Sequence, residues 1–287
     1  MPLPGQEAPR VRRSWLPGAV PHRLDGALHR SPLIEATESV ALFRLPTVGR
    51  FFVEAHQPVV VEQAEGADGA DVDCMFAGPI AALRCSLEGQ FCLRGAAVEV
   101  EGRAVVAVGG VGGTSSLAAT MALRGARVIA DGVVCVGGDP LAVWAPAGVT
   151  PGRVTLWAAT WRALSLDPAQ GSLIRRVLPS RSFSLGARAP GRPVPLGAVV
   201  LPFRDRSLGG GSPAAVGEAV RVPDAVTALR DAEWHAPVVA DLGKGQAELE
   251  WLIEVATAVK PKRLRRAEGA IAVTLAEMAR LAEGMLT

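Results

Sequence analysis

The stretch that decides the fold reads RAVVAVGGVGGTSSLAATMALRGARVIADG and covers residues 103–132. Its apolar run over residues 104–108 predicts a strand, and the glycine-rich residues 109–113 predict a tight loop after that strand. A helix is expected over residues 114–124, and a second strand over residues 126–130, ending at an Asp-Gly pair. Strand, loop, helix and strand within about 30 residues indicate a compact βαβ unit.

The regions on either side of this unit carry different patterns. Short apolar runs separated by turn residues predict strands, most of them before the unit and antiparallel. Apolar residues at three- and four-residue spacing predict helices, most of them after it. The predicted strands cover residues 40–45, 51–54, 58–62, 91–100 and 197–203, and the predicted helices cover residues 76–87, 157–166, 224–231, 246–259 and 268–285. We therefore expect an α/β fold of mixed α+β character, with a mixed sheet, N-terminal antiparallel strands and C-terminal helices.

The chain divides into three expected regions. Residues 1–35 are rich in Pro and Arg and predict an extended arm, residues 36–90 predict a small β-rich region packed on the core, and residues 91–287 predict the core with its C-terminal helices. Three segments are expected to be irregular or solvated: a polar loop at residues 64–73, a Pro/Arg/Gly-rich stretch at residues 182–197, and a basic connection between two helices at residues 260–266.

Composition excludes several classes of function. The chain has 287 residues, 49% of them apolar, and a net charge of only +2, which suits a globular protein and gives little support for nucleic-acid binding. It contains no run of about 18 apolar residues and no apolar core of a secretory signal, so we expect a cytoplasmic protein without a membrane partner. The four cysteines show no C-x-x-C spacing, so they are expected to be buried or half-buried thiols and not a zinc or redox pair.

The glycine loop is the candidate binding site. A glycine-rich turn between a strand and a helix directs backbone N–H groups inward, and the helix N-terminus adds positive potential, so the loop suits an anion. A working phosphate loop reads G-x-x-x-x-G-K-[ST], in which the lysine contacts the outer phosphates and the hydroxyl binds magnesium. Two registers fit, with either Ser115 or Thr114 at the lysine position, and neither supplies a lysine. The candidate binding residues of the loop are Gly109, Gly110, Gly112, Gly113, Thr114, Ser115 and Ser116.

The segment over residues 93–132 resembles the catalytic core of the HPr-serine-kinase-like proteins, the group that contains HPr kinase/phosphorylase. The likeness lies in LRGAAV at residues 93–98, in Gly102, in the glycine loop, and in RGARVIADG at residues 124–132. The spacing agrees over roughly 75 residues when residues 154–167 are included. The resemblance implies a phosphate-loop core with a mixed sheet, ATP or GTP with Mg as cofactor, and a peptide or protein as partner.

The chain departs from that pattern at the functional positions. The family histidine corresponds to Arg94, the loop lysine to Ser115, and the second residue of the acidic pair to Gly132. The resemblance assigns proton transfer to Asp131, and a magnesium site to Ser116 with Asp131. With one charged ligand such a site would be weak. Arg94 and Arg176 are the candidate replacement cations, because arginine binds phosphate well through its planar guanidinium.

Three hypotheses follow. The first is a catalytically degenerate HPr-kinase-like protein that acts as a binding or accessory subunit, for example in peptide modification, with weak or no ATP turnover. The second is an active serine or peptide kinase in which Arg94 or Arg176 replaces the lysine and Asp131 is the base. The third is a binder of another anionic small ligand at the glycine loop. The sequence assigns no cofactor, and weakly bound ATP or GTP with Mg is the alternative. The formation of a homo-oligomer is left open.

Overall fold

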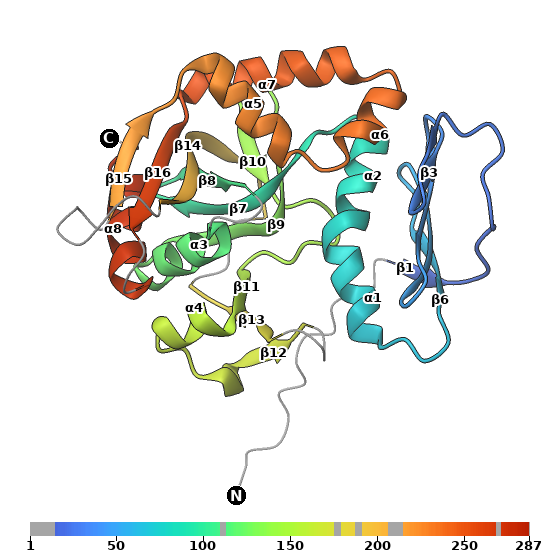
Figure 1. Ribbon diagram of the computed structural model, residues 1–287, viewed down its shortest axis with the longest axis horizontal. Helices are drawn as coiled ribbons and strands as arrows, with labels where there is room; N and C mark the ends of the chain where they lie inside the picture. Colours follow the sequence, from blue (N-terminus) through green and yellow to red (C-terminus); the bar gives the residue numbers. More distant parts are fainter. Residues whose placement is uncertain are drawn as a thin grey trace, which may run out of the picture.

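The computed structural model describes residues 15–109, 113–174, 179–186, 191–205, 215–267 and 271–286. The mixed α/β class is confirmed: two large sheets lie on opposite sides of a helical layer, and a third, small sheet lies below the larger one (Figure 1). In the described ranges, no helix has the length and apolar character needed to cross a membrane.

The N-terminal sheet has six strands in the order β1-β6-β5-β4-β3-β2. Its neighbours are antiparallel, as the sequence predicts, except for β1, which pairs in parallel with β6. Alternation shows that one face of this sheet is against the core, since Phe51 and Val53 on β5 are fully buried while their chain neighbours are more exposed. The strands are β1 (Trp15–Pro17), β2 (His29–Arg30), β3 (Ile34–Ala36), β4 (Val40–Leu45), β5 (Gly49–Glu54) and β6 (Val59–Gln63).

The extended arm expected over residues 1–35 is wrong for its described part. Residues 1–14 lie outside the described ranges, whereas β1 and β2 are both strands of the six-stranded sheet. Trp15 is the physical reason, because its side chain is 7% exposed and packs in the core beneath this sheet. A single buried tryptophan in a Pro/Arg-rich segment gives no periodic signal in the sequence.

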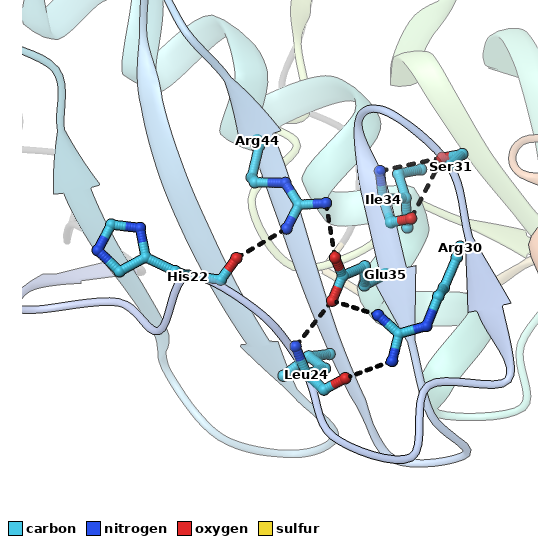
Figure 2. Close-up of polar contacts among 7 residues, drawn as sticks. All are labelled: His22, Leu24, Arg30, Ser31, Ile34, Glu35 and Arg44. Atoms are coloured by element: carbon cyan, nitrogen blue, oxygen red, sulfur yellow. Dashed lines mark hydrogen bonds and ion pairs between the residues drawn. The ribbon is translucent and has the colours of Figure 1, made fainter.

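A buried carboxylate attaches the loop before β2 to this sheet (Figure 2). Glu35 on β3 accepts hydrogen bonds from the Leu24 N–H at 2.7 Å and from Arg44 Nη2 at 2.9 Å. Arg30 Nη1 lies 3.2 Å from the same carboxylate, and Arg30 Nη2 donates to the Leu24 carbonyl. The Leu24 N–H, followed by the two arginines, holds the pKa of Glu35 below its usual value.

The larger sheet has seven strands in the order β10-β9-β7-β8-β14-β16-β15. Strand β10 also pairs with β14, so part of the sheet closes on itself. The expected strand-helix-strand unit is present as β8, α3 and β9, but β7 lies between the two strands and is antiparallel to both. The strands are β7 (Cys92–Val100), β8 (Arg103–Val108), β9 (Arg127–Gly137), β10 (Ala142–Trp144), β14 (Val194–Asp205), β15 (Ala215–Ala219) and β16 (Lys262–Ala267).

Helices cover both faces of this sheet (Figure 1). Helices α5 and α7 pack on one face and α3 and α8 on the other. Helices α1 and α2 stand between the two large sheets and are joined by η1, a π-helical turn at Pro79, where proline removes a backbone donor. The helices are α1 (Gly69–Met75), η1 (Phe76–Ile80), α2 (Ala81–Leu87), α3 (Thr114–Leu123), α4 (Ala158–Ala163), the 3-10 turn η2 (Pro168–Gln170), α5 (Val222–Ala232), α6 (Ala236–Asp241), α7 (Gly245–Val259) and α8 (Ile271–Glu283).

Two further expectations are wrong in part. The polar loop over residues 64–73 contains the start of α1, which Asp68 caps by accepting a hydrogen bond from the Ala70 N–H. The irregular stretch over residues 182–197 contains strand residues at both ends. A small sheet in the order β11-β13-β12 uses the first end, through β11 (Arg153–Trp157), β12 (Gly171–Leu173) and β13 (Ser180–Ser184).

The basic run over residues 260–266 is a strand and not a solvated connection between helices. Its residues form β16, which lies between β14 and β15. Leu264 is fully buried, and Arg265 contacts Asp205 at 2.9 Å and Glu218 at 2.6 Å. One apolar anchor and paired charges therefore suffice for a strand here, although the run shows no apolar alternation.

Candidate functional site

The glycine loop leads from a strand into a helix, as expected. Strand β8 ends at Val108, and α3 begins at Thr114 after Gly113, which has φ +97° and ψ 28°. Gly109 has φ +137°, a backbone conformation that favours glycine. Residues 110–112, and with them Gly110 and Gly112, lie outside the described ranges. The residues on either side form the expected strand end and helix start, and an anion-binding loop between them stays a prediction.

The start of α3 directs backbone donors toward the loop. Its first helical hydrogen bond runs from the Leu117 N–H to the Gly113 carbonyl, and no side chain caps its first residue. The N–H groups in the first turn of a helix have no partner within the helix, and the helix dipole makes that end positive. These donors belong to Thr114, Ser115 and Ser116, so three of the predicted binding residues stand where an anion would be held.

Asp131 and Ser115 are in direct contact. The Ser115 hydroxyl donates to Asp131 Oδ1 at 2.7 Å, and the Thr155 N–H donates to Oδ2 at 2.7 Å. Burial raises the pKa of Asp131 to about 6, although the bonds from Thr155, Ser115 and the Gly132 N–H act in the opposite direction. Asp131 therefore changes charge near neutral pH, and both of its oxygens already accept hydrogen bonds.

Ser116, the expected magnesium hydroxyl, lies in a different environment. Its Oγ is 3.1 Å from Thr160 Oγ1 on α4, and Thr160 is buried. The predicted pair of metal ligands is therefore divided, since Asp131 is bonded to Ser115 and Ser116 to Thr160. Magnesium needs near-octahedral oxygen ligation and usually keeps several waters, so one carboxylate and one hydroxyl form a poor site.

Arg94 stands beside the first residue of the loop. Its carbonyl on β7 accepts a hydrogen bond from the Gly109 N–H at 3.0 Å. Its guanidinium carbon lies 4.6 Å from the centre of the Trp234 ring, and Trp234 Nε1 donates to the Gly132 carbonyl at 3.0 Å. A cation over an indole face is favourable by about 0.5–2 kcal/mol. Trp234 thus holds one of the two candidate replacement cations; the other, Arg176, lies outside the described ranges.

A cleft opens next to Asp131, with a volume of about 930 Å³. It lies between α1 and η1 on one side and the three-stranded sheet on the other. Its wall combines apolar side chains with hydroxyls and charges, as ligand sites do. The lining residues include Trp15, Asp73, Phe76, Asp131, Val149, Thr150, Arg153, Thr155, Ser172, Leu173, Ile174 and Ser182.

A buried pair of acids behind Trp234 was not predicted from the sequence. Glu233 and Glu248 are 3% and 0% exposed, and Arg230 Nε lies 3.3 Å from Glu248. Burial, followed by the nearby Glu248 carboxylate, raises the pKa of Glu233 to about 9. Glu233 therefore keeps its proton at neutral pH. Glu233 directly follows the end of α5, and Glu248 lies 15 positions later on α7, so only the packing of α5 on α7 reveals the pair.

Comparison with known proteins adds no relative: no protein-family model matches the chain, and no curated protein matches it. The fold is that of a mixed α/β protein in which strand β8 and helix α3 flank the glycine loop. Its likeness to the HPr-serine-kinase-like group rests on the residues of the sequence alone.

The titration of Asp131 gives a prediction for anion binding. Lowering the pH from 8 to 5 is expected to strengthen sulfate binding roughly fivefold, because protonation removes a negative charge that repels an anion at the start of α3 by ~1 kcal/mol. Sulfate is the suitable ligand, since it does not change its own charge in this range. The affinity should rise around pH 6, the pKa of Asp131, in calorimetric titrations.

The matched variant is Asp131→Asn, which is neutral at every pH. It should bind sulfate with a nearly constant affinity, close to the acidic value of the wild type. A wild-type affinity that is flat with pH, or an Asn variant that keeps the full dependence, would contradict this assignment.

Proposed function

We propose that this chain is a catalytically degenerate HPr-kinase-like protein, which holds an anion at the start of α3 and acts as a binding or accessory subunit for a peptide or protein. ATP turnover is weak or absent in this proposal. The observation that carries it is the 2.7 Å hydrogen bond between Ser115 and Asp131. The resemblance places the loop lysine at Ser115 and the proton acceptor at Asp131, so the two functional positions are joined here by a neutral hydroxyl.

The energetics support binding without efficient phosphoryl transfer. A charge-assisted hydrogen bond contributes about 1.5–3 kcal/mol net, and phosphoryl transfer depends mainly on positioning and on neutralising phosphate charge. The backbone donors at the start of α3 are available to bind an anion, whereas the lysine of a working phosphate loop is absent. The site therefore keeps part of its affinity for phosphate and loses most of what would stabilise the transition state.

The cleft beside Asp131 supports a peptide or protein partner. At about 930 Å³ it lies near the upper end of the volumes of ligand sites, roughly 300–1,000 Å³. Leu173 at its edge is 53% exposed, and Arg153 and Asp73 supply charges of both signs. An extended peptide with mixed side chains fits such a wall better than a compact charged metabolite does.

A charge introduced at the start of α3 tests the binding role. Ser116→Glu is expected to lower the affinity for ATP or sulfate by about tenfold, since a carboxylate would occupy the positive end of the helix. Ser116→Gln has the same shape without the charge and should lose much less. Both variants remove the hydroxyl contact between Ser116 and Thr160, so the difference between them reports the added charge and not the loss of that contact. Equal affinities in both variants, measured by calorimetry, would overturn the proposal.

A second candidate function is an active kinase in which Arg94 replaces the lysine. Two observations favour it: Arg94 adjoins Gly109, and Asp131 has a pKa of about 6, which suits a general base. Labelled phosphate transfer to serine-containing peptides distinguishes the two. Transfer that is lost in Arg94→Gln and in Asp131→Asn supports the kinase, and its absence in the wild type supports the binding role.

A further inference from the structure

Three cysteines far apart in the sequence meet in the interior of the protein. Cys85 lies on α2, Cys92 at the start of β7 and Cys135 on β9, and they are 3%, 1% and 0% exposed. The Sγ atoms of Cys92 and Cys135 are 3.2 Å apart, those of Cys85 and Cys135 are 3.7 Å apart, and all three lie within 4.8 Å of one another. The sequence expectation of separate buried thiols is therefore incomplete, because the fold gathers three of them.

The spacing fits a single metal ion. A metal–sulfur bond of about 2.3 Å places the sulfurs about 3.8 Å apart around a tetrahedral ion and about 4.0 Å apart around a trigonal one. The separation of Cys85 from Cys135 agrees with these values, and that of Cys92 from Cys135 is shorter by several tenths of an ångström. Small rotations of the Cys92 and Cys135 side chains about χ1 would make up this difference.

The ligand set selects the kind of ion. Three sulfur ligands favour soft metals such as Cu(I) over hard cations. In the described ranges, no His, Asp or Glu belongs to the same cluster, so these residues offer three protein ligands and not four. Structural zinc takes four ligands in nearly all cases, whereas Cu(I) is stable with three.

Lys244 supplies a positive charge at the end of the helix that carries Cys85, since its Nζ donates to the carbonyl of Ser86 at 2.7 Å. Arg84, the chain neighbour of Cys85, does not add to this charge, because its guanidinium is paired with Glu88 at 2.8 Å.

We propose that Cys85, Cys92 and Cys135 form a buried thiolate site for one Cu(I) ion, which ties α2 to β7 and β9. The ion enters as Cu(I), each thiol that binds releases its proton to solvent, and no electron is transferred. Two of its three ligands lie on the strands that carry Arg94 and Asp131, β7 and β9. The proposal is independent of the glycine loop and of the function proposed for it.

Anaerobic titration of the reduced, metal-free chain with Cu(I), against a chromophoric Cu(I) chelator, tests the site. We expect one ion per chain, a sulfur-to-copper charge-transfer band, and an X-ray absorption spectrum with sulfur alone around the copper. Cys135→Ser and Cys85→Ser should each weaken or abolish binding. Cys74→Ser is the matched control, because Cys74 lies outside the cluster, and it should bind as the wild type does.

The spectrum of the wild type keeps the test decisive even where a cysteine variant does not fold. Copper surrounded by nitrogen or oxygen, equal binding in all the variants, or preference for zinc over Cu(I) would overturn the proposal. The loss of two free thiols together with the mass of two hydrogen atoms, in the absence of metal, would overturn it as well. That result would show that Cys92 and Cys135, which lie directly opposite each other in the β7–β9 ladder, form a disulfide instead.

Discussion

Replacement of Ser115 with lysine is expected to raise the affinity for ATP–Mg by about 10- to 100-fold. The lysine would restore a charge-assisted contact of about 1.5–3 kcal/mol, and each 1.4 kcal/mol changes an affinity tenfold. The position is favourable, since Ser115 lies in the first turn of α3 and its hydroxyl already faces Asp131. Titration calorimetry of both proteins measures the difference.

The matched control is Ser115→Gln, which adds a long polar side chain without charge. It should leave the affinity for ATP–Mg within a few-fold of the wild-type value. An equal gain in the two variants would show that contact area and not charge is responsible. No gain in Ser115→Lys would show that the start of α3 does not face a phosphate site.

Gly95→Ala is expected to destabilise the fold by about 4 kcal/mol or more, which is exceptional for a single substitution. Gly95 lies on β7 between β8 and β9, opposite Val108 and Gly132. A Cβ atom added there would stand 2.2 Å from the carbonyl oxygen of Ala107, a backbone atom that cannot rotate away. The ladder between β7 and β8 must then open at the point where it supports the glycine loop.

Denaturant unfolding measures this loss, and Gly69→Ala serves as its control. No atom beyond its chain neighbours lies within 4 Å of the Cβ added at Gly69, which is the first residue of α1. That variant should match or slightly exceed the wild-type stability, because alanine favours helix. A Gly95→Ala protein within about 0.5 kcal/mol of the wild type would contradict the predicted clash.

Local patterns predicted much of the fold. Strand β8 and helix α3 follow from an apolar run, a glycine loop and the hydroxyl residues after it, and both are present with nearly the expected bounds. Strands β4, β5 and β6 and helices α5, α7 and α8 are likewise set by periodicity within short windows. The contact between Ser115 and Asp131 agrees with the placement of both residues in one site, although the hydrogen bond itself was not predicted.

Long-range pairing accounts for what the sequence did not reveal. That β7 separates β8 from β9 depends on which strands meet, and spacing along the chain does not encode this. The basic run forms β16 because Asp205 and Glu218 neutralise Arg265. These two acids lie 60 and 47 positions before Arg265 in the chain. The place of Trp15 in the cleft wall and the clustering of the three cysteines were not predicted for the same reason. Each depends on contacts between segments that are distant in the chain.

Calorimetric titration of the unmodified protein with ATP, with and without Mg²⁺, followed by ³¹P NMR of the same mixtures, tests the central claim most directly. If backbone donors at the start of α3 hold phosphate without a lysine, ATP should bind weakly, with little dependence on Mg²⁺ and without formation of ADP. Tight, Mg²⁺-dependent binding with release of ADP would contradict the account, as would the absence of any binding at millimolar ATP.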